Sequence, residues 1–302
     1  MAKRKPKGQK SHAFRNKLLL NQWLISLFGI DPLNERNLNG QRPFRKLADL
    51  LSDQRLEGLD HDNLHHFYHA LVDSDLLSCG LCALSKEQIL LYEENIVRHT
   101  LGINKKRRRP VIWKYYQWLT LLFAEVYLDR FFSNPEGLLG DLNEFVKKFN
   151  SHWSDYADVP PYSEDDLNKL CLQNATGSGK TLLMHVNLLQ YRHYAAKHGK
   201  DKELSRVILL TPNERLSEQH DTELRESDID IGHYRDSRGR MQSEGKGLKC
   251  VDVLEITKLA EQEGPNTIAT RSLGDQNLLL VDEGHRGMSG KEEGAWFTRR
   301  SD

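Results

Sequence analysis

The chain has 302 residues, which is enough for two domains. Its 43 basic and 43 acidic residues leave a formal net charge of zero, so the overall charge indicates no partner. No run of about 18 uncharged apolar residues is present, and the basic N-terminus is not followed by an apolar secretory core. These features exclude a transmembrane helix and a secretory signal, and we expect a cytoplasmic protein with no membrane partner.

Residues 1–17 are predicted to form a basic, flexible arm. Such an arm can touch nucleic-acid phosphates, but it can equally be a solvated tail, and the residues favour neither. The basic side chains are Lys3, Arg4, Lys5, Lys7, Lys10, Arg15 and Lys17.

Residues 18–150 are predicted to form a mainly helical domain, because their apolar side chains recur at helical spacing. Four histidines in this region raise the hypothesis of a metal site, since two of them lie one helical turn apart. No carboxylate completes a familiar ligand set, so we favour a polar helix face. These histidines are His61, His65, His66 and His69.

Cys79 and Cys82 have the spacing of a pair of metal ligands. A zinc site needs a second pair, and neither Cys171 nor Cys250 has another cysteine nearby. We therefore favour buried structural cysteines, and a redox pair remains the alternative.

The sequence Lys-Lys-Arg-Arg-Arg at 105–109 is a basic cluster that Pro110 closes. It is interpreted as a solvated loop, with contact to phosphates as the functional alternative. Within the aromatic stretch 113–132, one helical face carries a set of apolar and aromatic side chains, which favours core packing over a base-stacking platform. They are Trp113, Tyr116, Leu119, Phe123, Val126 and Tyr127. Residues 151–167 contain two prolines and several acids and are interpreted as a linker.

From residue 168 onward, β-prone runs alternate with helical ones. The eight residues 174–181, Asn-Ala-Thr-Gly-Ser-Gly-Lys-Thr, lie between a predicted buried strand at Leu170–Gln173 and a predicted helix at Leu182–Leu189. Strand, glycine-rich turn and helix form the context of a phosphate-binding loop, whose N–H groups surround an anion at a helix N-terminus. The nucleotide-binding residues are predicted to be Ala175, Thr176, Gly177, Ser178, Gly179, Lys180 and Thr181. Lys180 would reach the β- and γ-phosphates, and the Thr181 hydroxyl would bind Mg²⁺.

Further strands are predicted at Arg206–Thr211, Ile229–Ile231 and Cys250–Leu254, with a helix at Asn213–Glu226. The run 278–282 is predicted to be a fully buried strand that ends in acid. This alternation predicts an α/β fold with a parallel sheet whose ligand lies at the carboxyl ends of the strands. There, Asp282 is assigned to Mg²⁺ and Glu283 to the attacking water.

Together the phosphate loop and the sequence Asp-Glu-Gly-His at 282–285 resemble a superfamily 2 helicase or translocase of the DEAD/DEAH-like class. The stretch 211–219 is similar to the family's Thr-Pro-x-x-x-Leu-x-x-Gln element, which implies that Thr211, Pro212 and Gln219 contact nucleic acid. Within this class the motifs resemble most the helicase (Res) subunit of type III restriction enzymes. The resemblance covers about residues 168–290 of the printed sequence.

The resemblance implies an enzyme that binds ATP and Mg²⁺ and couples hydrolysis to movement on DNA, in a restriction or phage-defence system. It also implies that residues 168–302 form a RecA-like ATP-binding domain that is incomplete, with a second RecA-like domain or subunit and a methyltransferase subunit as partners. Because such a second domain contributes arginines to hydrolysis, we expect weak or no turnover from the isolated chain. The alternatives are a nucleotide-binding regulatory or partner-binding module and an inactive fragment.

Overall fold

The computed structural model describes residues 18–33, 45–78, 80–154, 158–175, 177–232, 247–260 and 267–284. The chain divides into two compact units. The first comprises Met1–Val97 and Ile112–Asn174, and the second comprises Arg98–Val111 and Ala175–Asp302. The predicted basic arm, Cys79, Thr176 and His285 lie outside the described residues.

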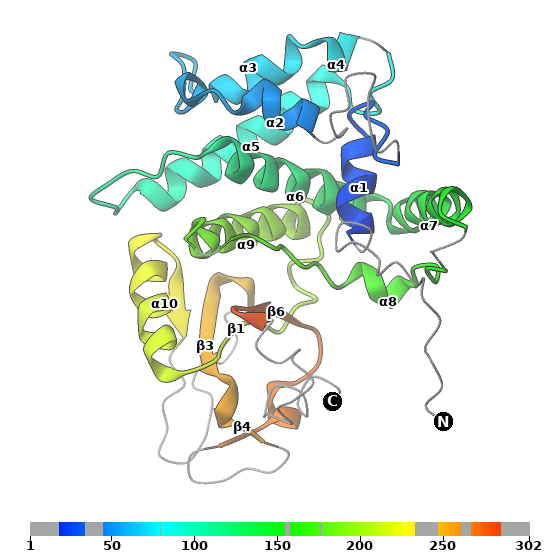
Figure 1. Cartoon of the computed structure of the whole chain (residues 1–302). Coiled ribbons are helices and arrows are strands. Elements are labelled where there is room, and N and C mark those ends of the chain that lie inside the picture. Colours follow the sequence, from blue (N-terminus) through cyan, green and yellow to red (C-terminus); the bar gives the residue numbers. More distant parts are fainter. Residues whose placement is uncertain are drawn as a thin grey trace, which may run out of the picture. The chain divides into compact units, whose positions relative to one another are not determined.

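The described residues of the first unit are helical, as predicted (Figure 1). The connection between the helices Tyr115–Ser133 and Pro135–His152 shows why the elements begin and end where they do. Pro135 opens the second helix, and the Asn134 side chain accepts the N–H of Gly137 at 3.0 Å. The helices are α1 (Leu19–Ser26), α2 (Arg45–Leu51), α3 (His66–Val72), α4 (Asp75–Ser78), α5 (Lys86–Asn104, which continues into the second unit), α6 (Tyr115–Ser133), α7 (Pro135–His152) and α8 (Glu164–Leu167).

The core of the first unit contains a buried carboxylate. Glu93 on α5 accepts the backbone N–H of His65 at 2.6 Å and the indole N–H of Trp118 at 2.8 Å. The His65 ring also lies against it, with Nδ1 2.7 Å from the carboxylate. His65 is 2% exposed, and it does not belong to the group of metal-ligating side chains found among the described residues. The predicted aromatic core face of α6 is wrong in one member, since Tyr116 is 39% exposed and Trp118 is fully buried instead.

The second unit contains a four-stranded, wholly parallel sheet in the order β2-β3-β1-β6 (Figure 1). The parallel α/β arrangement predicted for this part of the chain is therefore confirmed. Among the described residues, the α-helices α9 (Lys180–Lys197) and α10 (Glu214–Glu226) lie wholly within this unit, and α10 packs on β1 and β3. The strands are β1 (Arg206–Thr211), β2 (Asp230–Gly232), β3 (Cys250–Glu255) and β6 (Asn277–Val281); β4 (Leu259–Ala260) and β5 (Ile268–Ala269) pair separately.

Two predictions about strands are wrong. Leu170–Gln173 is not a strand, and all four residues are exposed. They line an apolar cavity of about 310 Å³ within the first unit, because apolar content alone does not supply a backbone pairing partner. Strand β6 is only partly buried, with Leu279 52% and Val281 44% exposed, because it lies at an edge of the described sheet.

The parallel register brings the carboxyl ends of the strands to one edge of the sheet. Leu210 on β1 pairs with Val281 on β6, and the N–H of Asp282 continues this ladder by donating to the Leu210 carbonyl at 3.1 Å. The residues that follow β1 and β6 therefore come together at this edge. In the part of the chain that the structure describes, no helix combines the length and apolarity that a membrane crossing requires.

Candidate functional site

The loop before α9 has the backbone that an anion-binding turn requires. Gly177 and Gly179 have φ values of 77° and 79°, and a Cβ added at Gly177 would meet no neighbour. Glycine is therefore required at Gly177 by its left-handed backbone and not by crowding. The N–H of Ser178 closes the turn on the Ala175 carbonyl at 3.1 Å, and α9 begins at Lys180. The loop thus ends at the N-terminus of an 18-residue helix, which favours negative charge.

Lys180 and Glu283 meet, although they are 103 positions apart in the chain. The ammonium of Lys180 lies 3.3 Å from Glu283 Oε1, and the two side chains are half-buried, at 30% and 23% exposed. Glu283 itself has a φ of 53°, so the chain turns sharply directly after Asp282. The structure therefore brings together the two residues predicted to be catalytic.

Asp282 is held at both oxygens. Its Oδ1 accepts the N–H of Glu283 at 2.9 Å, and its Oδ2 accepts from His220 Nε2 at 3.0 Å. The hydrogen bond from His220 lowers the pKa of Asp282 against the opposing effect of burial, and Lys180 adds a smaller favourable charge. Asp282 is therefore an ionised, oriented carboxylate, which is a suitable oxygen ligand for a hard cation.

The remaining predicted site residues lie on α9, at the end of β1 and on α10. Thr181 lies half-buried in the first turn of α9. Thr211, at the end of β1, is buried, and its hydroxyl lies 2.6 Å from Ser217 Oγ. Pro212 follows half-buried, while Gln219 is exposed on α10. Of the three residues predicted to contact nucleic acid, Gln219 is thus the one whose side chain is exposed.

Sequence reasoning missed His220, which directly follows Gln219 and bonds Asp282 from 62 positions away. Its place beside a recognisable motif was the only available signal. His185 on α9 was missed as well. It is buried, with Nδ1 2.8 Å from Ser227 Oγ, and burial lowers its pKa to about 3.

The basic cluster at 105–109 is partly internal to the fold. Arg107 is only 8% exposed and binds Glu223 at 2.9 Å and Glu226 at 3.1 Å, both on α10. Lys106 pairs with Asp228 at 2.6 Å. The solvated loop predicted here is therefore wrong for Arg107, because ion pairs attach that side chain to α10.

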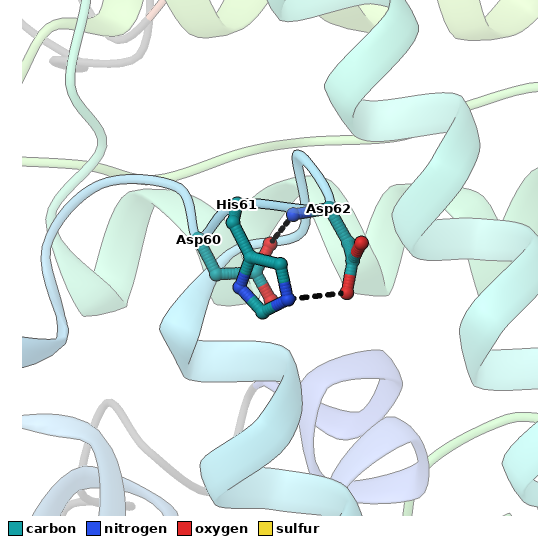
Figure 2. A group of neighbouring side chains, drawn as sticks. All are labelled: Asp60, His61 and Asp62. Atoms are coloured by element: carbon teal, nitrogen blue, oxygen red, sulfur yellow. Dashed lines mark hydrogen bonds and ion pairs between the residues drawn. The ribbon is translucent and has the colours of Figure 1, made fainter.

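One group of metal-ligating types lies in the first unit, on the turn before α3 (Figure 2). Ligand atoms of Asp60, His61 and Asp62 lie within 4.8 Å of one another. The side chains of His61 and Asp62 are 88% and 70% exposed and already pair with each other at 3.1 Å. The Asp60 carboxylate is engaged as well, since its Oδ2 lies 2.7 Å from His69 Nε2. We assign this group no function, because its atoms are accounted for by contacts within an exposed turn.

Comparison with protein families identifies one match. The model for "Type III restriction enzyme, res subunit" matches residues 141–297, slightly more than half of the chain. Searches among curated proteins and among solved structures returned no match. The matched range contains the phosphate loop, Asp282 and Glu283, so the resemblance derived from these motifs is confirmed.

Proposed function

The chain belongs to the type III restriction enzyme res subunit family, and we propose that it is the ATP-binding portion of an ATP-dependent DNA helicase or translocase. In this proposal it works in the cytoplasm, in a type III restriction-like or phage-defence system, and couples ATP hydrolysis to movement on duplex DNA. The observation that carries the proposal is the meeting of Lys180, Glu283 and Asp282 at the carboxyl edge of a parallel sheet.

The residues at this edge fit Mg-ATP. The left-handed glycines Gly177 and Gly179 direct the loop into the N-terminus of α9, where N–H groups and Lys180 attract phosphate. Thr181 and the ionised Asp282 supply the oxygens that Mg²⁺ prefers. Magnesium, when bound, would neutralise charge that develops on the phosphates.

The ion pair between Lys180 and Glu283 suggests how the two residues work together. A phosphate would compete with Glu283 for the Lys180 ammonium, since both are anions within reach of one cation. Release from Lys180 would leave the Glu283 carboxylate able to accept a hydrogen bond from a water and to orient it. Lys180 would then bind the phosphates, and Glu283 would act on the nucleophile.

The proposed contact with DNA rests on the element at 211–219. Gln219 is exposed on α10 and can reach a nucleic-acid backbone. Thr211 and Pro212 are assigned to the same contact through the family motif, although the Thr211 hydroxyl is engaged with Ser217. A second RecA-like domain or subunit and a methyltransferase subunit are the proposed protein partners.

The test is calorimetric binding of Mg-ATP to the full chain and to Lys180→Ala, with Lys197→Ala at the other end of α9 as the matched control. We expect binding by the unmodified chain and by Lys197→Ala. Binding should become undetectable in Lys180→Ala, because the phosphate loop loses its cation. The ATPase rate is then measured with and without duplex DNA.

The outcomes separate the candidate functions. Hydrolysis stimulated by DNA supports the helicase or translocase. Binding with weak or no hydrolysis is what we expect of an ATP-binding portion that depends on a second domain's arginines, and it does not by itself favour a nucleotide-binding regulatory module. No binding by the unmodified chain, or equal binding by Lys180→Ala, contradicts the proposed site.

A further inference from the structure

Four polar side chains near the site have no part in the proposed function. All belong to the second compact unit and come from the α5–α6 connection, α9, α10 and the C-cap of α10. They are Arg107, Ser227, His185 and His220. All four are largely or fully buried, so what each atom donates or accepts must be satisfied within the protein.

The series of contacts through these four side chains begins at Asp282, the proposed Mg²⁺ ligand. His220 is 2% exposed, and its Nε2 lies 3.0 Å from Asp282 Oδ2. Because the Asp282 carboxylate is an acceptor, Nε2 must carry the proton that is donated. In the neutral ring, Nδ1 is then an unprotonated acceptor, and it is buried with no hydrogen-bond partner among the described residues.

Arg107 lies at the other end of this series of contacts. Its Nη2 donates to Ser227 Oγ at 2.8 Å, and a guanidinium can only donate. The Ser227 oxygen therefore accepts from Arg107, and the Ser227 hydroxyl hydrogen can be donated to His185 Nδ1, which lies 2.8 Å from Oγ. We assign the acceptor role to His185 Nδ1, which in the neutral ring puts the proton on Nε2. The other tautomer, in which Nδ1–H donates to the second lone pair of Ser227, is the alternative that the ring spectra below distinguish.

The rings of His185 and His220 present complementary atoms. His185 presents a buried Nε2–H donor and His220 a buried Nδ1 acceptor, and within the described residues neither atom has a hydrogen-bond partner. The rings interact electrostatically, and burial keeps the pKa of His185 at about 3, so that ring is neutral near pH 7. Because neither atom has a hydrogen-bond partner among the described residues, the two rings do not bond directly, and a bridging water would satisfy both atoms.

We propose that His220 is a positioning residue for Asp282. It is the last member of a relay, Arg107–Ser227–His185–His220, in which a water bridges the two histidines and which couples the α5–α6 connection to the metal-binding carboxylate. Every group in the relay donates toward Asp282. The inference rests on the proposed function only in taking Asp282 as a Mg²⁺ ligand. The direction of the hydrogen bonds does not depend on it.

The first test needs no nucleotide. Long-range ¹H–¹⁵N spectra of the histidine rings in the unmodified full-length chain report which ring nitrogen carries the proton. We expect both His185 and His220 to be protonated at Nε2, with Ser227→Ala shifting the His220 resonances through the relay. A proton on Nδ1 of neutral His185, or a His220 ring that does not respond to Ser227→Ala, overturns the relay.

The second test measures the affinity for Mg-ATP against that for ATP without metal, by calorimetry. His220→Leu should weaken Mg-ATP binding by about 10–100-fold, as happens when a residue that hydrogen-bonds and orients a metal ligand is lost. The affinity for metal-free ATP should stay unchanged. His220→Gln, whose amide N–H can replace Nε2–H, should recover much of the loss. The matched control is His99→Leu, a largely buried histidine of the same unit outside the relay, which should bind both forms normally.

Coupling is tested by combining variants. Ser227→Ala alone should weaken Mg-ATP binding by about 2–30-fold. In a chain that already carries His220→Leu it should add no further loss, because the relay is already broken. Additive losses, or equal weakening of Mg-ATP and metal-free ATP by His220→Leu, overturn the proposal.

The failures of the two proposals can be told apart. If the unmodified chain does not bind Mg-ATP, the proposed function is contradicted, while the histidine spectra still decide the relay. If the unmodified chain binds and His220→Leu binds equally well, the proposed function stands and the positioning role of His220 is wrong.

Discussion

Individual side chains in this protein are defined by what surrounds them more than by their type. Lys180 and Lys197 begin and end the same helix, but Lys180 faces Glu283 from another element, whereas Lys197 lies over the Tyr194 ring of its own helix. His61 is almost fully exposed, whereas His185 is buried and its pKa falls to about 3. The same residue type therefore contributes differently to stability according to its burial.

His185 should make stability depend on pH. Its pKa is lowered in the folded chain to about 3 from an ordinary 6.5, so the unfolded chain binds the extra proton first as the pH falls. Stability from this residue is complete above pH ~6.5 and is lost as the pH falls toward 3, by about 2 kcal/mol at pH ~5.

The measurement is urea unfolding at several pH values for the unmodified chain, His185→Gln and His61→Gln. We expect His185→Gln to flatten the loss of stability between pH ~7.5 and ~5, even if it lowers stability at neutral pH. His61→Gln, at a side chain 88% exposed, should leave the slope unchanged. An unchanged slope in His185→Gln would show that the buried ring is not what makes the chain sensitive to acid.

At the scale of elements, the α5–α6 connection is attached to α10 by charge. The guanidinium of Arg107 contacts two carboxylates, a hydroxyl and the carbonyl of Glu223 at 3.1 Å. Its neighbour Lys106 forms a shorter but much more exposed pair with Asp228. Burial removes competition from water, so the Arg107 contacts should stabilise the fold far more than the Lys106 pair.

Arg107→Met should lower the free energy of unfolding by about 1–3 kcal/mol, since it removes several contacts and leaves Ser227 and both carboxylates without this donor. Lys106→Met should cost at most about 1 kcal/mol, because both of its charges are solvated. Denaturant unfolding of the two variants at one pH provides the comparison. Equal losses in both would mean that burial of Arg107 contributes little.

At the scale of the whole molecule, the chain forms two compact units, and the predicted phosphate loop begins where the second unit resumes at Ala175. Lys180, Asp282, Glu283 and His220 all belong to that second unit. A ligand at this site should therefore act first on the second unit. Ligand that binds only the folded chain stabilises it by about 2.7 kcal/mol at a hundred times its dissociation constant.

Amide hydrogen exchange with and without Mg-ATP tests this expectation. We predict slower exchange in α9, α10 and β6 and unchanged exchange in α3 and α7 of the first unit, because local opening in the first unit does not release the ligand. Lys180→Ala serves as the control and should show no effect of nucleotide. Protection that appears mainly in α3 and α7 would contradict the assignment of the site to the second unit.

The sequence alone predicted the features that are local in the chain. Helical spacing identified the N-terminal helices, alternation of strand and helix identified the parallel sheet, and the motifs around Lys180 and Asp282 identified the family. These succeed because period, turn chemistry and motif spacing are properties of neighbouring residues. The prediction failed at Leu170–Gln173, where apolar content suggested a strand but no pairing partner is present.

Only the tertiary structure decided which distant residues meet. It placed β6 at an edge of the sheet, paired Arg107 with α10, and brought His220 to Asp282 from 62 positions away. Such contacts depend on strand order and on how helices pack. A local pattern of polarity specifies neither the strand order nor the helix packing. The sequence by itself therefore determined the type of fold and the chemical groups at the predicted nucleotide site. The tertiary structure determined which buried side chains hold those groups in place.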